Sequence, residues 1–376
     1  MIRYLLASAA VLSGAGAASA GTISRSEQPV IVLFEKGGEN GRYIEGTISW
    51  AKPDVTGVDS AGDSTGQVGS ENWVLVAGIK GDFGDKWSAA RVFDQPYGAE
   101  LDYQASSLIY GGTTADVNAV GFTALARYKI NQNFSVHGGL RLARFGADVT
   151  LDGTNFAPIS GYTFQGDDAW GLGGVVGVAY EKPEIALRVI LTYSSEISFD
   201  LDTQETFPAP LTGFDGDSTT EVVVPQSVNL DFQTGVAKGT LLFGQIRWVN
   251  WDGFEVRPQS LDTLTGLPLT FKDYNVTHYK LGIGRQFTPT WAGAFQINYT
   301  PDQNQFGRIL DVVDGNKGVS AAATYTAPNG VKVTGAAGYV WFGDSTLRTG
   351  QPPNVNGAEF ADNTGLALQL KLAYNF

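Results

Sequence analysis

Long segments of this chain alternate apolar and polar residues with a period of two, and this pattern restricts the fold more than any other feature. In 120–130 (VGFTALARYKI), Phe122 and Ile130 share one face while Thr123 and Arg127 share the other. Successive side chains of a strand point to opposite faces, so such a segment is a predicted strand with one apolar face. The same alternation, with aromatic residues gathered at the ends of the apolar stripe, recurs in 170–180, 291–299 and 331–341. Soluble sandwiches use shorter strands, whereas a membrane-spanning barrel strand needs about 9–11 residues between aromatic girdles.

The connections between these segments are alternately short and long. Short turns are predicted at 81–86, 131–133, 181–184, 235–239, 288–290 and 327–330, and long polar stretches lie between them, for example at 149–167, 202–220, 253–271, 302–316 and 344–362. Outer-membrane barrels have short periplasmic turns and longer extracellular loops, and their strand number is even. The chain is therefore an all-β protein by prediction, a transmembrane antiparallel β-barrel of about 14 strands that ends on the alternating segment 366–376 (LALQLKLAYNF).

The N-terminus has the features of a secretory signal. Arg3 supplies a positive start, an apolar run follows, and Ala18-Ser19-Ala20 forms a small-residue cleavage site. An anchoring helix is the alternative, but the run is too short and too rich in alanine and glycine. We therefore expect a signal peptide at 1–20, a short plug-like N-terminal segment at 21–41 and the barrel at 42–376.

Composition excludes several classes of function. The net charge of −13 argues against a nucleic-acid partner, because such surfaces are basic. The chain has no cysteine, and its two histidines, His137 and His278, both fall on predicted strands. We find no set of nucleophile, base and orienting group, so no enzyme is expected. No metal site and no cofactor are predicted either.

A collinear series of motifs covers nearly the whole mature chain. It comprises 53-PDVTG-57, 97-YG-98, 111-GGTTAD-116, 169-AWGLGG-174, 189-VILTYSSEISFD-200, 224-VPQSV-228, 248-WVNWDGFEV-256, 271-FKDYNVTHYKLGIG-284 and 300-TPDQ-303. This order resembles the FadL family of outer-membrane transporters for long-chain fatty acids and related hydrophobic compounds. One departure is that family members usually carry a longer plug before the first strand, with an Asn-Pro-Ala signature that this sequence lacks.

The resemblance implies a location, a function and partners. The protein is expected in the bacterial outer membrane as a monomer, passively taking up long-chain fatty acids or other hydrophobic small molecules. Its other partners would be outer-membrane lipid, lipopolysaccharide and, during insertion, the barrel-assembly machinery. A general polar porin and a FadL-like channel for aromatic hydrocarbons are the alternative functions.

One predicted strand contains residues that disrupt a sheet. In 91-RVFDQPYGAELDY-103, Pro96 cannot donate a ladder hydrogen bond and Gly98 tolerates the backbone of a bulge. In FadL-type barrels the third strand is kinked and leaves a gap through which ligand passes sideways into the membrane. We therefore predict a lateral opening at Pro96, Tyr97 and Gly98. An ordinary bulge that adjusts barrel curvature is the alternative.

Two loops contain contiguous apolar residues, which on an exposed surface indicate a binding site. They are predicted to form the ligand entry, although mutual packing that stiffens the loops is an equal alternative; the residues are Phe156, Ile159, Tyr162, Phe164, Phe207, Leu211 and Phe214. Inward-facing cations that a ligand carboxylate could pair with are Arg141, Arg188, Arg247 and Lys280, unless they serve a structural ladder of opposite charges.

Overall fold

The structure is a computed structural model that describes residues 25–26, 29–303, 306–348 and 356–376. The expected signal peptide, residues 1–20, lies outside the described residues. None of the helices in the described part is long and apolar enough to cross a membrane.

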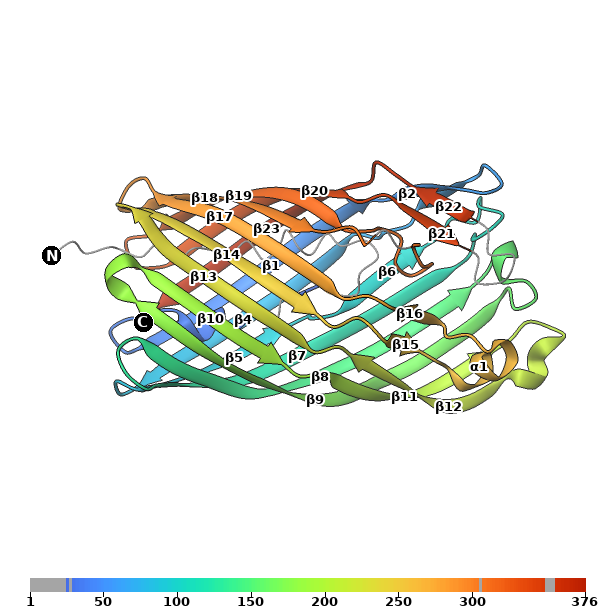
Figure 1. The fold of residues 1–376 in the computed structure, drawn as a ribbon, viewed down its shortest axis with the longest axis horizontal. Helices are drawn as coiled ribbons and strands as arrows, with labels where there is room; N and C mark the ends of the chain where they lie inside the picture. Colours follow the sequence, from blue (N-terminus) through green and yellow to red (C-terminus); the bar gives the residue numbers. More distant parts are fainter. Residues whose placement is uncertain (1–24, 27–28, 304–305, 349–355) are drawn as a thin grey trace.

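One antiparallel sheet closes on itself into a barrel of 14 strands, as predicted (Figure 1). Eleven of these strands are continuous: β1 (Arg42–Asp54), β4 (Asn72–Phe83), β7 (Thr114–Lys129), β8 (Phe134–Leu151), β9 (Tyr162–Lys182), β14 (Thr240–Val249), β17 (Val276–Gln286), β18 (Trp291–Thr300), β19 (Asn316–Thr326), β20 (Lys332–Phe342) and β23 (Thr364–Asn375). The other three are each interrupted once: β5 (Trp87–Asp94) with β6 (Gly98–Asp102), β10 (Leu187–Ser194) with β11 (Ile197–Thr206), and β12 (Gly216–Val224) with β13 (Ser227–Ala237).

The first and last strands of the barrel pair with each other. Tyr43 of β1 lies opposite Asn375 of β23, and the pairing runs to Asp54 and Thr364. On its other edge β1 pairs with β4, so the sheet has no free edge there. Closure matters because no water is available inside the bilayer to satisfy an exposed strand edge.

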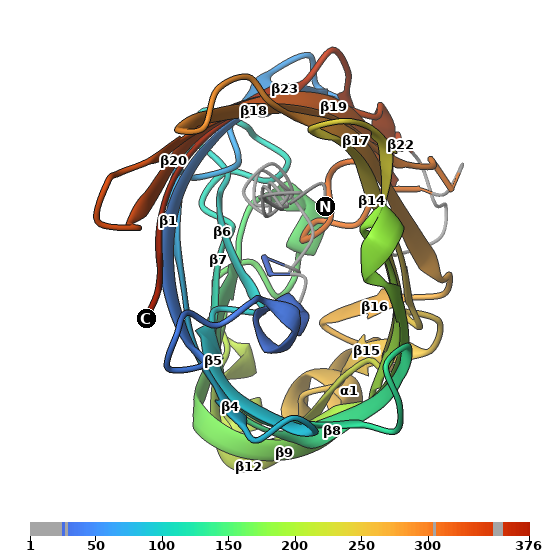
Figure 2. The same ribbon diagram turned by 90° about the vertical axis from the view of Figure 1, so that its left-hand side faces the viewer.

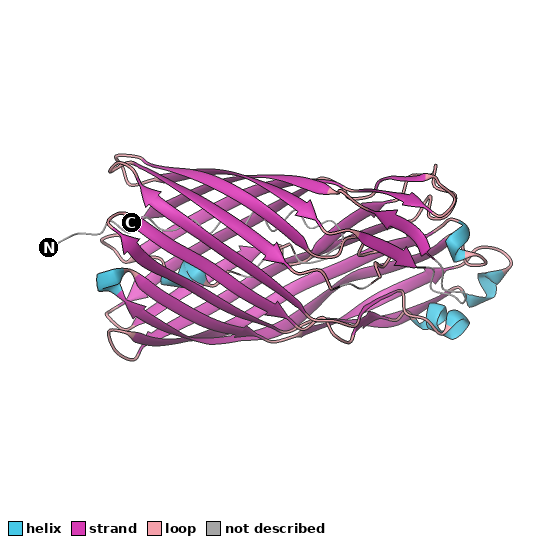
Figure 3. Ribbon diagram, turned by 45° about the horizontal axis from the view of Figure 1, so that its top comes forward, coloured by secondary structure: helices cyan, strands magenta, loops and turns pink. Residues whose placement is uncertain are grey.

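The two ends of the barrel differ in the length of their connections. Short turns and the C-terminus lie at one end, and long loops with small elements lie at the other (Figure 1). The small elements are β2 (Thr56–Asp59), β3 (Ser64–Gln67), β21 (Ser345–Arg348) and β22 (Asn356–Phe360), which form one sheet, and β15 (Phe254–Val256), β16 (Thr270–Lys272), α1 (Gln259–Thr265), η3 (Thr154–Phe156) and η5 (Leu211–Phe214) (Figure 3). By the rule for such barrels, the long-loop end is extracellular.

The outer face carries the apolar band that a bilayer requires. Trp73, Phe122 and Leu172 are all about half exposed. The inward-facing residues next to them along their strands are buried. Near the short-turn end, neighbouring strands pair aromatic rings, as in Trp87 with Tyr128 and Phe134 with Tyr180. Rings gathered at a membrane–water boundary are the expected girdle.

Residues 30–34 of the N-terminal segment lie within the lumen. Its short 3₁₀ helix η2 (Ile31–Phe34) appears in blue inside the ring of strands in Figure 2. Val32 and Leu33 are fully buried, in a cluster with Ile190 and other inward residues of the strands. The Arg188 guanidinium donates to the Phe34 carbonyl at 3.0 Å, and the Lys80 ammonium donates to the Glu35 carbonyl at 2.8 Å. Backbone carbonyls exposed by the end of this short helix are thus satisfied by lumen cations.

Candidate hydrophobic passage

The wall of the barrel is interrupted between β4 and the third strand. The β4–β5 ladder runs from Phe83 opposite Trp87 only as far as Ala77 opposite Phe93. Beyond the interruption, Gly69 lies opposite Leu101 in the same register, with hydrogen bonds from Ser70 to Glu100 and from Asp102 to Val68. Between these points residues 71–76 and 94–99, all described, form no ladder pair with each other. The wall therefore has a stretch without strand pairing, with backbone pairing above and below it; this unpaired stretch is the candidate lateral opening.

A one-residue bulge accounts for the break. On the β7 side, Asp94 lies opposite Gly121 and Gly98 lies opposite Asn118, so three residues face two. The inward positions accordingly change from Val92 in β5 to Ala99 in β6. A bulge bends its strand and disrupts the ladder locally. The Gln95 side chain accepts from the Leu75 backbone N–H at 2.7 Å and replaces one lost ladder bond.

The N-terminal segment lies against the inner side of this opening. The backbone N–H groups of Arg25 and Ser26 both donate to the Pro96 carbonyl, at 2.9 and 3.3 Å. The Ser26 hydroxyl donates to the Asp94 carboxylate at 2.8 Å, and both side chains are buried. Five polar groups of two distant segments therefore meet at the break.

Gly98 provides room rather than an unusual backbone angle. It does not have a positive φ, in contrast to the expectation that its conformational freedom serves the bulge. A Cβ at this position would lie 2.5 Å from the Arg25 guanidinium. Burial lowers the pKa of the Arg25 guanidinium, and the negative charges of Asp116 and Glu100 oppose that shift. Both carboxylates lie on the outward face of their strands, so negative charge on the outer side of the wall attracts the Arg25 guanidinium.

A second interruption, between β9 and β11, is filled. Pairing stops at Val175 opposite Ser194 and resumes at Gly166 opposite Thr203. The side chain of Ile197 lies against the backbone of Gly171 and Gly173, where a Cβ would approach it to 2.5 and 2.7 Å. This part of the wall is therefore covered from the inside by an apolar side chain.

An apolar cavity of about 60 Å³ lies in the extracellular half of the lumen, directly beyond the opening. Ala99 and Leu101 of β6 form part of its wall. The remaining lining comes from the strands β7–β9 and β12 and from the long loops: Ala115, Val117, Phe145, Ala147, Val149, Phe164, Val222, Trp251, Phe254, Val256, Leu269, Thr270, Lys272, Leu310 and Asp311. The kinked strand thus borders both the cavity and the gap in the wall.

The charged residues of this cavity form an ion pair. The Lys272 ammonium lies 2.5 Å from the Asp311 carboxylate, and the two side chains are only 11% and 7% exposed. Burial raises the pKa of the Asp311 carboxyl, while the Lys272 charge opposes that shift. Neither residue was predicted as a site residue, although Lys272 stands in the motif 271-FKDY-274.

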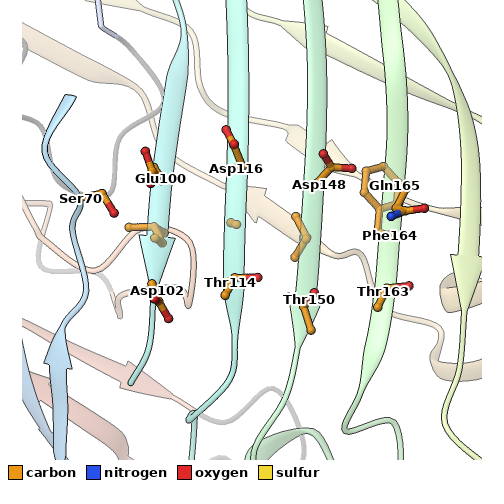
Figure 4. Close-up of a pocket in the computed structure, with 13 residues that line it drawn as sticks. Ser70, Glu100, Asp102, Thr114, Asp116, Asp148, Thr150, Thr163, Phe164 and Gln165 are labelled. Carbon is orange, nitrogen blue, oxygen red and sulfur yellow. The ribbon is translucent and has the colours of Figure 1, made fainter. Parts of the chain in front are cut away.

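A polar groove of about 320 Å³ lies on the outward face of β6–β9, beside the opening. Figure 4 shows its side chains in two rows, with Glu100, Asp116, Asp148 and Gln165 in one and Asp102, Thr114, Thr150 and Thr163 in the other. These residues are register neighbours on adjacent strands. No group of three acidic or histidine side chains in the described part of the chain is arranged to hold a metal ion.

The predicted entry residues pack mainly on one another. The Tyr162 ring lies 4.8 Å from the Phe207 ring, which in turn lies 6.2 Å from Phe214. Ile159 and Phe207 are buried, Phe156 and Leu211 are half-buried, and Phe214 is 36% exposed. Placing Tyr162 and Phe164 in a loop was wrong. Both are buried inward residues of β9, whose 21 residues exceed the roughly 9–11 that one membrane crossing needs.

A buried carboxylate ties these loops to helix α1. Glu205 accepts hydrogen bonds from the backbone N–H groups of Ser260 and Leu261, at 2.7 and 2.8 Å. It also accepts from the Tyr162 hydroxyl at 2.8 Å. Carboxylates stabilise helix N-termini by satisfying free N–H groups there. Glu205 therefore joins β9, β11 and α1 above the cavity.

The four predicted lumen cations all lie inward but outside the cavity lining. Arg141 donates to Thr123 at 2.9 Å, Arg188 binds the Phe34 carbonyl, and Arg247 donates to Asn229 at 2.7 Å. Lys280 is buried on β17, directly across from Gln245. Among the described residues that line the cavity, Lys272 alone brings a positive charge.

Comparisons with known proteins agree with this architecture. A family model described as outer membrane protein transport protein (OMPP1/FadL/TodX) matches residues 33–376. A FadL homologue from Pseudomonas aeruginosa superposes with a TM-score of 0.74 at 14% identity, covering 97% of this chain and 98% of that one.

Two further solved structures share the fold. The toluene transporter TodX of P. putida has a TM-score of 0.65 at 13% identity, over 97% of this chain and 99% of that one. The CymD monoaromatic hydrocarbon channel has a TM-score of 0.64 at 12% identity, over 97% and 98%. No curated protein sequence matches significantly.

Proposed function

Because the chain belongs to the OMPP1/FadL/TodX family of outer-membrane transport proteins, we propose that it takes up hydrophobic compounds and releases them sideways into the bilayer. An apolar ligand does not cross the polar lipopolysaccharide layer readily, yet it gains roughly 0.8 kcal/mol per CH₂ on entering an apolar site. Transfer from the apolar cavity to lipid through the wall therefore needs no energy source.

The observation that carries the proposal is the position of the opening between β4 and β6. The bulge at residues 95–97 leaves the wall unpaired next to the strand residues, Ala99 and Leu101, that line the cavity. A bulge that only adjusts curvature would interrupt the β7 side, and the loss of pairing on the β4 side would not be needed. A general polar porin also has no use for an apolar cavity at its extracellular end.

The N-terminal segment acts in this proposal as the closure of the passage. Residues 29–35 pack against inward side chains of the strands, and Arg25 and Ser26 bind the edge of the opening. Passage through the wall then requires only that this short contact be released. Ligand moves from the extracellular loops into the cavity, then past Tyr97 to the outer leaflet.

Uptake by cells that lack their own hydrophobic channels tests the function. Labelled toluene and labelled oleate are supplied separately to cells with and without the protein, and a heat-modifiable band confirms the folded barrel. Protein-dependent uptake of at least one compound is expected. Uptake of neither compound by a folded, inserted barrel would overturn the proposal, and ion conductance in that case would indicate a polar pore.

A further inference from the structure

The cation of the apolar cavity is held by more than its carboxylate partner. The Lys272 ammonium lies 5.3 Å from the centre of the Trp251 ring and 5.5 Å from that of Tyr274. The Tyr274 hydroxyl also donates to the Asp311 carboxylate, at 3.4 Å. Aromatic faces attract an ammonium group. Lys272 is therefore fixed in place by one full negative charge and two rings.

This arrangement determines what charge a ligand can bring into the cavity. A carboxylate that entered would be desolvated close to Asp311, and the one ammonium in the lining is already neutralised. A buried charge without a partner is strongly disfavoured. An uncharged molecule meets a mostly apolar wall and a neutral ion pair. It therefore does not have to give up the hydration of a charged group.

The size of the cavity also favours a compact ligand over a fatty carboxylate. At about 60 Å³ it is smaller than the roughly 150 Å³ apolar cavity that admits benzene in another protein. Small movements of lining side chains such as Leu269 and Leu310 would accommodate one ring. A long alkyl chain would require several lining side chains to leave a well-packed cluster.

We propose that the Lys272–Asp311 pair makes this cavity selective for compact, uncharged apolar molecules, with aromatic hydrocarbons as the substrate class, and that it discriminates against fatty carboxylates. This inference rests on the proposed uptake function. Asp311 is the specificity-determining residue, because it removes the positive charge that a carboxylate would otherwise bind.

The test compares labelled toluene and labelled oleate uptake in cells that express the wild type, D311N or the double variant K272M/D311N. We expect the wild type to take up toluene and not oleate. D311N leaves the Lys272 charge without its carboxylate, so oleate uptake should rise about tenfold, which corresponds to ~1.4 kcal/mol. The double variant removes that charge and should again exclude oleate while taking up toluene.

A matched control is D262N, which breaks the exposed loop pair of Arg257 and Asp262 (2.5 Å) outside the cavity and should leave both rates unchanged. Wild-type oleate uptake equal to toluene uptake would overturn the selectivity while leaving the uptake function intact. Unchanged oleate exclusion in a folded D311N barrel would also overturn it. If the wild type takes up neither toluene nor oleate, that result would instead contradict the proposed function itself. If D311N fails to fold, D311S removes the same carboxylate and takes its place, and oleate exclusion by a folded D311S barrel would overturn the selectivity.

Discussion

The Ser26 hydroxyl donates a 2.8 Å hydrogen bond to the Asp94 carboxylate, and this contact joins the N-terminal segment to the residue at which the third strand leaves the ladder. Both side chains are buried, and Asp94 is fully inaccessible to solvent. A charge-assisted bond of this kind is stronger than one between neutral groups. The contact is therefore a suitable place to hold the passage closed.

Locking this contact should stop uptake. The chain has no cysteine, so S26C/D94C introduces the only two thiols, and a short reducible thiol cross-linker can join them. We expect uptake in the cross-linked barrel to fall to the level of cells without the protein and to recover after reduction. Each single-cysteine variant, treated in the same way, serves as a control. Full uptake by the cross-linked protein would show that the segment does not need to move.

Restoring a regular third strand should also reduce uptake. Pro96→Val returns a backbone N–H, and Gly98→Thr places a side chain where the Arg25 guanidinium now lies. The double variant is expected to lose most toluene uptake while it still inserts as a heat-modifiable barrel. Pro225→Val, at the break between β12 and β13, is the matched control and should transport normally. If the double variant transports normally, the kink only shapes the barrel.

The sequence was sufficient for the barrel because each strand faces lipid on one side and the lumen on the other. This two-sided environment produces the alternation around Phe122 and Leu172. It was insufficient for Tyr162 and Phe164, because β9 continues beyond the membrane and its outward residues there are polar. The role of Lys272 in the cavity could not be predicted, because it depends on an ion pair with Asp311, which is distant in the chain and belongs to another loop.

The structure of the third strand was also only partly predictable from the sequence. Pro96 and Gly98 mark a disrupted strand in any sequence. That the unpaired stretch facing β4 ends where Gly69 meets Leu101 depends on a bridge that only the folded loops create. The contact of Ser26 with Asp94 has no local sequence signal at all.

Acidic pH should destabilise the extracellular loop of residues 55–67, because it protonates the Asp59 carboxylate. Its carboxylate accepts from the Ser107 hydroxyl at 2.7 Å and from the backbone N–H groups of Ala61 and Asp63, at 2.9 and 3.0 Å. Burial alone would raise the pKa of Asp59, but these hydrogen bonds outweigh it and the pKa lies below the ordinary value.

The sign of the pH effect follows from this lowered pKa. The unfolded loop binds its proton at the ordinary value of about 3.9 and the folded loop only at lower pH, so the ionised carboxylate stabilises the fold above that range. The stabilisation is lost as the pH falls through the lower folded value. Asp59→Asn should remove this pH dependence and weaken the loop by about 1–3 kcal/mol at neutral pH. Hydrogen exchange of residues 55–67 in the purified barrel, at pH 7 and below pH 4, measures both effects; equal exchange in the variant and the wild type would contradict them.

The two roles considered for the entry loops make different predictions at Phe207 and Phe214. Phe207 is 5% exposed between the rings of Tyr162 and Phe214, so Phe207→Ala leaves a hole and should cost about 3–5 kcal/mol of local stability. Phe214 is 36% exposed, so Phe214→Ala should leave stability nearly unchanged. If the loops capture ligand, Phe214→Ala nevertheless lowers uptake at low toluene concentration, because it removes apolar surface at the entrance. Protease sensitivity of the loops on intact cells and initial uptake rates separate the two effects. Normal uptake by Phe214→Ala, with loop cleavage in Phe207→Ala alone, would mean that these residues only stiffen the loops.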